Sequence, residues 1–168
     1  MTSKRFLKKV TLSDLTELSL MLKDFWRSQL VEASDEDILE DIRRMLSPKC
    51  FGYLIMLDDS IAGFTFVNEK YGYTNNIEYL YIKPEFRRKG LASFALKKIK
   101  EIVLAKGNSR VQIEVAPNNI SALKLYYKQG FTSIDTITLS TSIVGKTKKF
   151  TFQNLEFLAN PKESFKDN

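Results

Sequence analysis

The sequence predicts an α/β fold, classed as α+β in some schemes, with a single mixed sheet of about seven strands covered by about four helices. Three observations lead to this prediction. The expected elements follow the order strand, two helices, three strands, helix, strand, helix, two strands. A turn at Gly90 separates an apolar, β-rich run from a segment with helical periodicity. The strand before this turn and the strand that ends at Ala116 are joined by a helix, so they should be parallel neighbours.

The first elements are set by helix-start signals. A short strand near 6–10 precedes Ser13-Asp14, which can start a helix. Ser34 and Asp37 resemble a capping box that starts a second helix, although Asp is a poorer partner there than Glu. The apolar stripe of the first helix has helical spacing and should enter the core: Leu15, Leu18, Leu22, Phe25 and Trp26.

The remaining elements follow from strand patterns, turn residues and helix caps. Asp58-Asp59-Ser60 should form a hairpin turn, and Gly107-Asn108 should end a helix. In chain order, we expect the second helix to end near Leu46, strands at 51–57, 61–67 and 74–82, a helix from Gly90, a strand at 111–115, a helix capped by Asn118 or Asn119 and closed by Gly130, and strands at 131–139 and 149–157.

Length and composition suit one compact domain. A chain of 168 residues with 43% hydrophobic content should bury one core, so we expect a single domain at 1–160 and a frayed C-terminal tail at 161–168. No run of 18 apolar residues is present. We therefore expect a soluble, cytoplasmic protein that does not bind membranes.

The absence of histidine excludes several chemistries. Without histidine, serine-histidine and cysteine-histidine catalysis and most catalytic zinc sites are excluded, and we expect no metal. Cys50 is the only cysteine, so it cannot form an internal disulfide, and we interpret it as a packing residue. A proton acceptor must be a carboxylate, a tyrosine, a lysine or a relayed water.

Positive charge is concentrated in one strand-to-helix segment. Residues 83–110 hold nine lysines and arginines against two glutamates, a net charge of +7, while the whole chain carries +6. This segment should therefore bind a polyanion. A nucleic-acid-binding domain could show the same concentration, but no helix-turn-helix, zinc-finger or aromatic RNA-binding signature accompanies it, so we expect no nucleic acid.

The turn before the third helix has the features of a phosphate site. The first amides of a helix lack intrahelical partners and carry about +0.5 charge. Gly90 would let the backbone approach an anion closely, and Arg87, Arg88 and Lys89 would supply charge.

This turn and a second motif together resemble a known family. The two motifs are Arg87-x-x-Gly90-x-Ala92 and Asn119-x-x-Ala122-x-x-Leu125-Tyr126-x-x-x-Gly130-Phe131. At this spacing, the pattern resembles the GNAT superfamily of acetyl-CoA-dependent N-acetyltransferases over about 77–131. The sequence departs from it at Ala92, where the family has a second glycine, a tolerated variant. The resemblance implies a GNAT-like acyl-CoA N-acyltransferase fold and acetyl-CoA as cosubstrate.

The resemblance also implies roles for individual residues. One strand would pair its backbone with the pantetheine arm, the following turn would hold the pyrophosphate, and two diverging strands would leave a V-shaped gap for the thioester. Asn119 would touch the cofactor arm and Tyr126 would point at the sulfur. The implied cofactor-binding residues are Leu80, Tyr81, Ile82, Arg87, Arg88, Lys89, Gly90, Leu91, Ala92, Ser93, Asn119 and Tyr126.

The chemistry of acetyl transfer agrees with these roles. An aliphatic ammonium has a pKa of about 10.4 and must lose a proton before it attacks, and the departing thiolate, with a pKa of about 8.5, is helped by a nearby phenol. Tyr126 suits the donor role. We expect the base to be Glu114 or Glu78. Glu114 stands twelve residues before Tyr126, where resembling ribosomal-protein N-terminal acetyltransferases have a glutamate that acts as the base. Glu78 stands on the preceding strand, where other family members have a carboxylate. Strand parity and any bulge decide which one faces the gap.

The acceptor is less constrained by the sequence. Acidic residues crowd 32–41 and would suit a small cationic amine, such as an aminoglycoside or polyamine, or a protein amine. A solvated helix face is the simpler interpretation, and the lysines at 146–149 would oppose a cation. Exposed strand edges near the C-terminus would suit a homodimer. The alternative function is a non-catalytic acyl-CoA-binding or interaction module.

Overall fold

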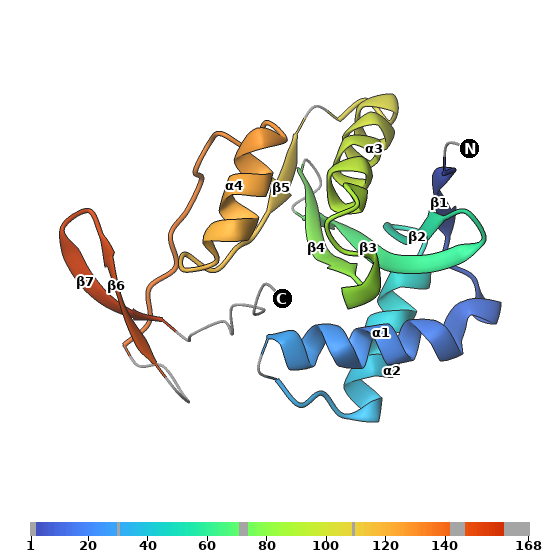
Figure 1. The fold of residues 1–168 in the computed structure, drawn as a ribbon, viewed down its shortest axis with the longest axis horizontal. Helices are drawn as coiled ribbons and strands as arrows, with labels where there is room; N and C mark the ends of the chain where they lie inside the picture. The colour runs from blue at the N-terminus through green and yellow to red at the C-terminus, as the bar shows by residue number, and fades with distance from the viewer. Residues whose placement is uncertain (1–2, 30, 71–73, 109, 142–146, 160–168) are drawn as a thin grey trace. The chain divides into compact units, whose positions relative to one another are not determined.

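A five-stranded mixed sheet organises the first part of the chain in the computed structural model (Figure 1). The structure describes residues 3–29, 31–70, 74–108, 110–141 and 147–159. Strands pair as neighbours in chain order, antiparallel through the fourth strand, and the last pair is parallel as predicted. The strands are β1 (Arg5–Lys9), β2 (Cys50–Leu57), β3 (Ser60–Lys70), β4 (Thr74–Ile82) and β5 (Val111–Ile113).

The chain divides into two compact units, Met1–Glu114 and Val115–Asn168. The expectation of a single domain at 1–160 stays a prediction, and the predicted tail at 161–168 lies outside the described residues. The first unit contains the sheet, α1 (Leu15–Ser28), α2 (Asp35–Leu46), α3 (Leu91–Ala105) and two 3-10 turns, η1 (Leu12–Asp14) and η2 (Pro84–Phe86). The second contains α4 (Ile120–Lys128), β6 (Lys148–Phe152) and β7 (Leu155–Ala159).

Side-chain hydrogen bonds fix the start of η1, which leads directly into α1, and the start of α2. The Asp14 carboxylate is almost fully buried and accepts hydrogen bonds from the Thr11 amide at 2.9 Å and the Lys8 amine at 2.6 Å. The predicted capping box of α2 is confirmed, because the Ser34 hydroxyl accepts from the Asp37 amide and the Asp37 carboxylate accepts from the Ser34 amide. These contacts satisfy amides that would otherwise lack a partner.

The sheet is covered by helices on both faces, as Figure 1 shows for α1 and α2 on one side and α3 on the other. The cluster beneath α1 and α2 joins Phe64, Phe66 and Tyr79 of the sheet to helix residues such as Leu22 and Ile42. The opposite face joins Ile55, Ala62, Leu80 and Ile82 to Leu91 and Ala95 of α3. Cys50 packs against the first cluster, as predicted.

Gly63 allows β3 and β4 to approach closely. A Cβ atom at this position would lie 2.1 Å from the Tyr81 carbonyl oxygen, far inside van der Waals contact. Because the clashing atom belongs to the backbone, a side chain here would displace β4.

The C-terminal strands differ from the sequence prediction. The expected strand at 131–139 is wrong: residues 131–139 are described and contain no strand, because no neighbouring segment pairs with them. The expected strand at 149–157 is instead the β6–β7 hairpin, whose turn residues Gln153 and Asn154 have φ of 51° and 61°. The predicted single sheet of about seven strands is therefore a five-stranded sheet and a separate two-stranded one.

Among the described residues, the order of element types and the number of α-helices agree with the prediction, although the two final strands lie later in the chain than expected. Within the described ranges, no helix combines the length and apolar character that a bilayer span needs.

Candidate active site

The ladder between β4 and β5 ends early and leaves part of β4 with a free edge. The two strands pair from Asn75 with Val111 to Ile77 with Ile113, and β4 then continues to Ile82. Among the described residues, no strand pairs with 78–82 on this side. We call the point just past the Ile77–Ile113 pair the fork. Free strand edges offer backbone groups to an extended ligand.

The turn that follows β4 is open and cationic. Arg88 and Gly90 both have left-handed backbone conformations, with φ of 62° and 73°. No side chain caps α3, and a Cβ atom on Gly90 would meet only the Arg5 guanidinium, 3.5 Å away. Arg87 donates from Nε to the Ile82 carbonyl oxygen at 3.0 Å, which ties the turn to the end of β4.

These features fit the anionic groups of coenzyme A. The first amides of α3 carry no side-chain cap, exposed cations surround them, and glycine leaves room for a phosphate. Leu91 itself is buried in the α3 core, whereas Ala92 and Ser93 are partly exposed. The predicted cradle residues Arg87, Arg88, Lys89 and Gly90 therefore lie together at one helix start.

The β4 segment before this turn carries a bulge at Glu78. In the ladder with β3, Phe66 pairs with Tyr79 and Val67 pairs with Ile77, so Glu78 has no partner opposite it. A bulge changes the alternation of side chains along the strand. Consequently the consecutive residues Glu78 and Tyr79 both contact α2.

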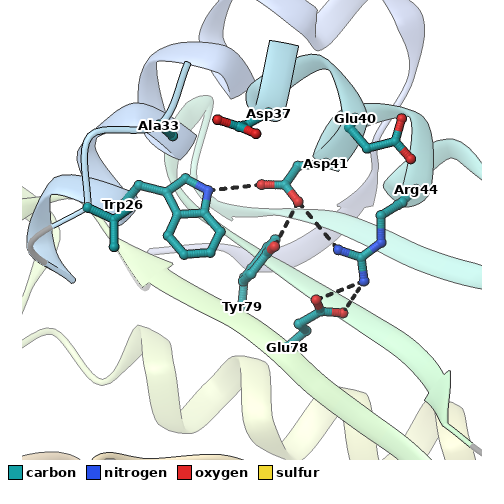
Figure 2. A pocket seen from close by; sticks show the side chains of 9 residues that line it. Trp26, Ala33, Asp37, Glu40, Asp41, Arg44, Glu78 and Tyr79 are labelled. Atoms are coloured by element: carbon teal, nitrogen blue, oxygen red, sulfur yellow. Dashed lines mark hydrogen bonds and ion pairs between the residues drawn. The ribbon is translucent and has the colours of Figure 1, made fainter. Parts of the chain in front are cut away.

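A pocket of about 460 Å³ lies beside this bulge (Figure 2). Its wall includes one indole, one phenol, four carboxylates and a single guanidinium. Elements α1, α2, β4 and the α1–α2 connection contribute the lining residues, which are Trp26, Val31, Ala33, Asp37, Glu40, Asp41, Arg44, Glu78 and Tyr79.

Hydrogen bonds connect the polar residues of the pocket into one network. The buried Asp41 carboxylate accepts from the Trp26 indole at 2.9 Å, the Tyr79 hydroxyl at 2.7 Å and Arg44 at 3.4 Å. Arg44 also donates to both oxygens of Glu78, at 2.8 and 2.5 Å (Figure 2). Burial and the Asp41 hydrogen bond raise the pKa of the Tyr79 phenol, so it stays protonated.

Arg44 stays charged in this network. Partial burial alone would lower the pKa of its guanidinium, but the hydrogen bonds and the negative charge of Glu78 outweigh burial and raise the pKa above its usual range. Arg44 also lies over the Phe66 ring, with 5.2 Å between the guanidinium carbon and the ring centroid.

Both candidate bases lie at the fork. Glu78 and Glu114 each directly follow the last paired residue of their strand, Ile77 and Ile113. Glu114 is exposed, whereas about a quarter of the Glu78 side chain is exposed.

Several of the acidic residues at 32–41 form local hydrogen bonds or ion pairs. Asp35 pairs with Lys23 at 2.6 Å, Asp37 serves the α2 cap, and Glu40 lies 3.5 Å from Arg43. These contacts support the simpler interpretation of this segment as a paired and solvated helix face.

The second unit contains the remaining predicted site residues. Asn119 caps α4, since its side-chain oxygen accepts from the Ala122 amide at 3.2 Å. Tyr126 is partly buried within α4, with its ring centroid 6.1 Å from that of Phe131. Burial raises the pKa of the Tyr126 phenol, so it is protonated at neutral pH. The helix ends where Phe131 donates its amide to the Tyr126 carbonyl oxygen and Gly130 adopts φ of 89°.

A comparison with known protein families shows which family this chain belongs to. The model of the acetyltransferase (GNAT) family matches residues 17–131, more than half of the chain. The chain belongs to the GNAT acetyltransferase family. The resemblance found in the sequence is therefore confirmed, and the match reaches further upstream than the two motifs.

Solved GNAT structures share the fold of this chain. The aminoglycoside N-acetyltransferase AAC(6')-Iy in complex with CoA has a TM-score of 0.71 at 16% identity, over 84% of this chain and 97% of that one. YycN from Bacillus subtilis gives 0.64 at 18%, over 84% and 100%. The aminoglycoside acetyltransferase meta-AAC0020 from an uncultured soil metagenomic sample, in complex with sisomicin, gives 0.65 at 13%, over 84% and 97%. At these identities the likeness establishes the fold alone.

The sequence analysis missed the central residues of the pocket in this GNAT chain. The sequence places Asp41 in the acidic segment at 32–41, for which a solvated helix face or a site for a cationic amine is expected, places Trp26 in the core stripe, and predicts no role for Arg44. The partner of Arg44 lies 34 residues away, a distance at which no local pattern operates. A tryptophan on a helix stripe, which needs a partner for its N–H, was the one available signal.

Proposed function

We propose that the protein transfers an acetyl group from acetyl-CoA to a primary amine. One observation carries the proposal: the free edge of β4 leads directly into the open, cationic turn at the start of α3. A pantetheine arm needs an extended backbone partner, and a diphosphate needs unpaired amides and positive charge. This chain supplies both in consecutive segments.

The donor would lie along β4 and the α3 turn. Leu80, Tyr81 and Ile82 would pair with the pantetheine arm through their backbone groups. The pyrophosphate would be held by the amides from Arg88 to Ser93, with charge from Arg87 and Lys89. We also assign Asn119 to the cofactor arm, a role compatible with its hydrogen bond to α4.

The reaction requires two proton transfers. The amine nitrogen bonds to the acetyl carbon as the carbon–sulfur bond breaks, so the amine loses a proton and the thiolate gains one. We assign the donor role to Tyr126, because a phenol with a pKa of about 10 or above is protonated at neutral pH and can give that proton to the departing thiolate. A carboxylate at the fork, Glu114 or Glu78, would take the amine proton directly or through water.

The acceptor would be a small cationic amine, such as an aminoglycoside or polyamine, or a protein amine. The pocket beside Glu78 supports a small molecule, because it places aromatic walls and carboxylates next to the fork. Solved structures of similar fold include an aminoglycoside acetyltransferase with a CoA-linked acetylneamine analogue and another with sisomicin.

The proposal is tested by thiol release. Calorimetry with coenzyme A should first show binding, and release of free thiol from acetyl-CoA should then be measured with aminoglycosides, polyamines and short peptides. Turnover with at least one amine supports the proposal. Tight coenzyme A binding without turnover on any amine would instead favour a non-catalytic acyl-CoA-binding module, and no binding would contradict both.

A further inference from the structure

Arg5 brings a cation from the edge strand β1 to the turn before α3. A Cβ atom on Gly90 would lie 3.5 Å from the Nη1 atom of Arg5, on the side of the glycine that is open to a ligand. This contact joins the first strand of the chain to a turn that follows the fourth. The positive charge at the turn therefore comes from two elements, and not from the basic run at 87–89 alone.

The pleat of β1 explains why Arg5 lies on this side of the sheet. Side chains two positions apart share one face of a strand. Leu7 packs in the cluster beneath α3, whereas Phe6 packs in the cluster on the opposite face. Arg5 has the parity of Leu7, and its ladder partner Leu57 belongs to the α3 cluster as well. The guanidinium therefore emerges on the α3 face, beside the start of that helix.

The described residues give Arg5 no acidic partner. The residue is exposed, and none of the ion pairs among them includes it. Asp58 follows its ladder partner directly, and this carboxylate accepts a hydrogen bond from the Lys4 amide at 2.7 Å. A fourth cation beside the three at 87–89 costs free energy, because like charges repel. This repulsion favours an anion that binds between β1 and the α3 turn.

We propose that Arg5 is a further coenzyme A-binding residue, whose guanidinium donates hydrogen bonds to the diphosphate at Gly90. This inference rests on the proposed function, which places the diphosphate on the amides from Arg88 to Ser93. A guanidinium can donate two parallel hydrogen bonds to one phosphate. Arg5 would hold the diphosphate from β1 while the amides hold it from α3. Arg5 lies outside residues 17–131, which match the family model, so the shared motifs do not supply this contact.

Calorimetric titration tests this role with coenzyme A and with dephospho-coenzyme A, which lacks the ribose phosphate but keeps the diphosphate. Arg5→Gln should raise the Kd by about tenfold or more for both ligands, because it removes a charge-assisted hydrogen bond to a phosphate. Equal Kd values in the wild type and Arg5→Gln would overturn the role. A loss of affinity confined to coenzyme A would also overturn it, because Arg5 would then bind the ribose phosphate.

Two further variants separate a local contact from net charge. Lys9→Gln removes the same charge from the same strand and face, about 13 Å along β1, so its Kd should stay within about twofold of wild type. Equal losses in Lys9→Gln and Arg5→Gln would contradict a contact at Gly90. Arg5→Lys keeps the charge but not the planar fork, so its Kd should lie between those of the wild type and Arg5→Gln. It also replaces Arg5→Gln in the test if that variant does not fold.

The wild-type titration separates this inference from the proposed function. If the wild type binds neither ligand, the donor site of the proposed function fails, and the role of Arg5 fails with it. If the wild type binds both ligands and Arg5→Gln binds them equally well, the proposed function stands and only this inference is overturned.

Discussion

At the scale of single residues, Tyr126 and Tyr127 show how helix geometry places two adjacent tyrosines in different environments. The two side chains are neighbours in sequence but lie about 100° apart around α4. Tyr126 is partly buried, and burial raises the pKa of its phenol. The Tyr127 side chain is 68% exposed. The buried phenol is the one that we assign to the donor role.

Replacing Tyr126 with phenylalanine should therefore slow the chemical step. We expect kcat to fall by about 10²-fold, because a general acid typically contributes at least this much, while the Kd for coenzyme A changes little. The measurements are steady-state thiol release and calorimetry. Tyr127→Phe is the matched control and should keep the wild-type kcat. Equal effects of the two changes would remove Tyr126 from the donor role.

A second residue-scale prediction concerns Asp14 and acid stability. Burial alone would raise the pKa of this carboxyl, but hydrogen bonds from Lys8 and Thr11 outweigh burial and lower the pKa below its usual value. A lowered pKa stabilises the folded state above the unfolded-state pKa of about 3.9, and this stabilisation is lost as the pH falls through the folded-state pKa. Asp14→Asn should lower the free energy of unfolding by about 1–2 kcal/mol at pH 7.

Urea unfolding at several pH values measures this effect. The difference between wild type and Asp14→Asn should shrink as the pH falls from ~4 through the lowered folded-state pKa, because the protonated carboxyl then resembles the amide. Asp35→Asn is the control, because the Asp35 pair with Lys23 is exposed and its loss should matter much less. A difference that stays constant as the pH falls would contradict this account.

At the scale of elements, the glycines before and after α3 show that the same backbone conformation can have different proposed roles. Gly90 and Gly107 both have left-handed conformations, with φ of 73° and 82°, and both have space for a methyl group. Gly90 precedes α3 beside the cationic turn, whereas Gly107 follows the same helix. The two glycines therefore share a backbone requirement but differ in their proposed role.

An alanine at either glycine should cost about 1 kcal/mol of stability, since an L-residue is strained at positive φ. Only Gly90→Ala should weaken coenzyme A binding, by about tenfold or more, because its methyl group would lie where the diphosphate approaches. Calorimetric titration of both variants gives the comparison. Equal affinities in the two variants would argue against a diphosphate at Gly90.

At the scale of the whole molecule, coenzyme A binding should raise the Tm and show whether the two units unfold in a single transition. Coenzyme A at about 100 times its Kd should stabilise the folded state by about 2.7 kcal/mol. For a chain of this size, that corresponds to a rise in Tm of about 5–11 °C. The single-domain prediction requires one transition that shifts as a whole in a scanning calorimeter.

Two separate transitions, of which only one shifts with coenzyme A, would show that Met1–Glu114 and Val115–Asn168 unfold independently. The matched control is Gly90→Ala, which should show a smaller ligand-induced rise at the same coenzyme A concentration. An unchanged Tm in the wild type at saturating coenzyme A would count against the donor site itself.

The sequence by itself determined the element order, the capping box at Ser34, the turn at Gly90 and the family. Each of these depends on residues a few positions apart, where helix periodicity, capping and turn conformation act. Only the tertiary structure decided the bulge at Glu78, its pairing with Arg44, and the formation of β6–β7 as a separate sheet. These features depend on which distant segments become neighbours, since a strand exists only where a partner satisfies its backbone and a one-residue shift reverses its side chains.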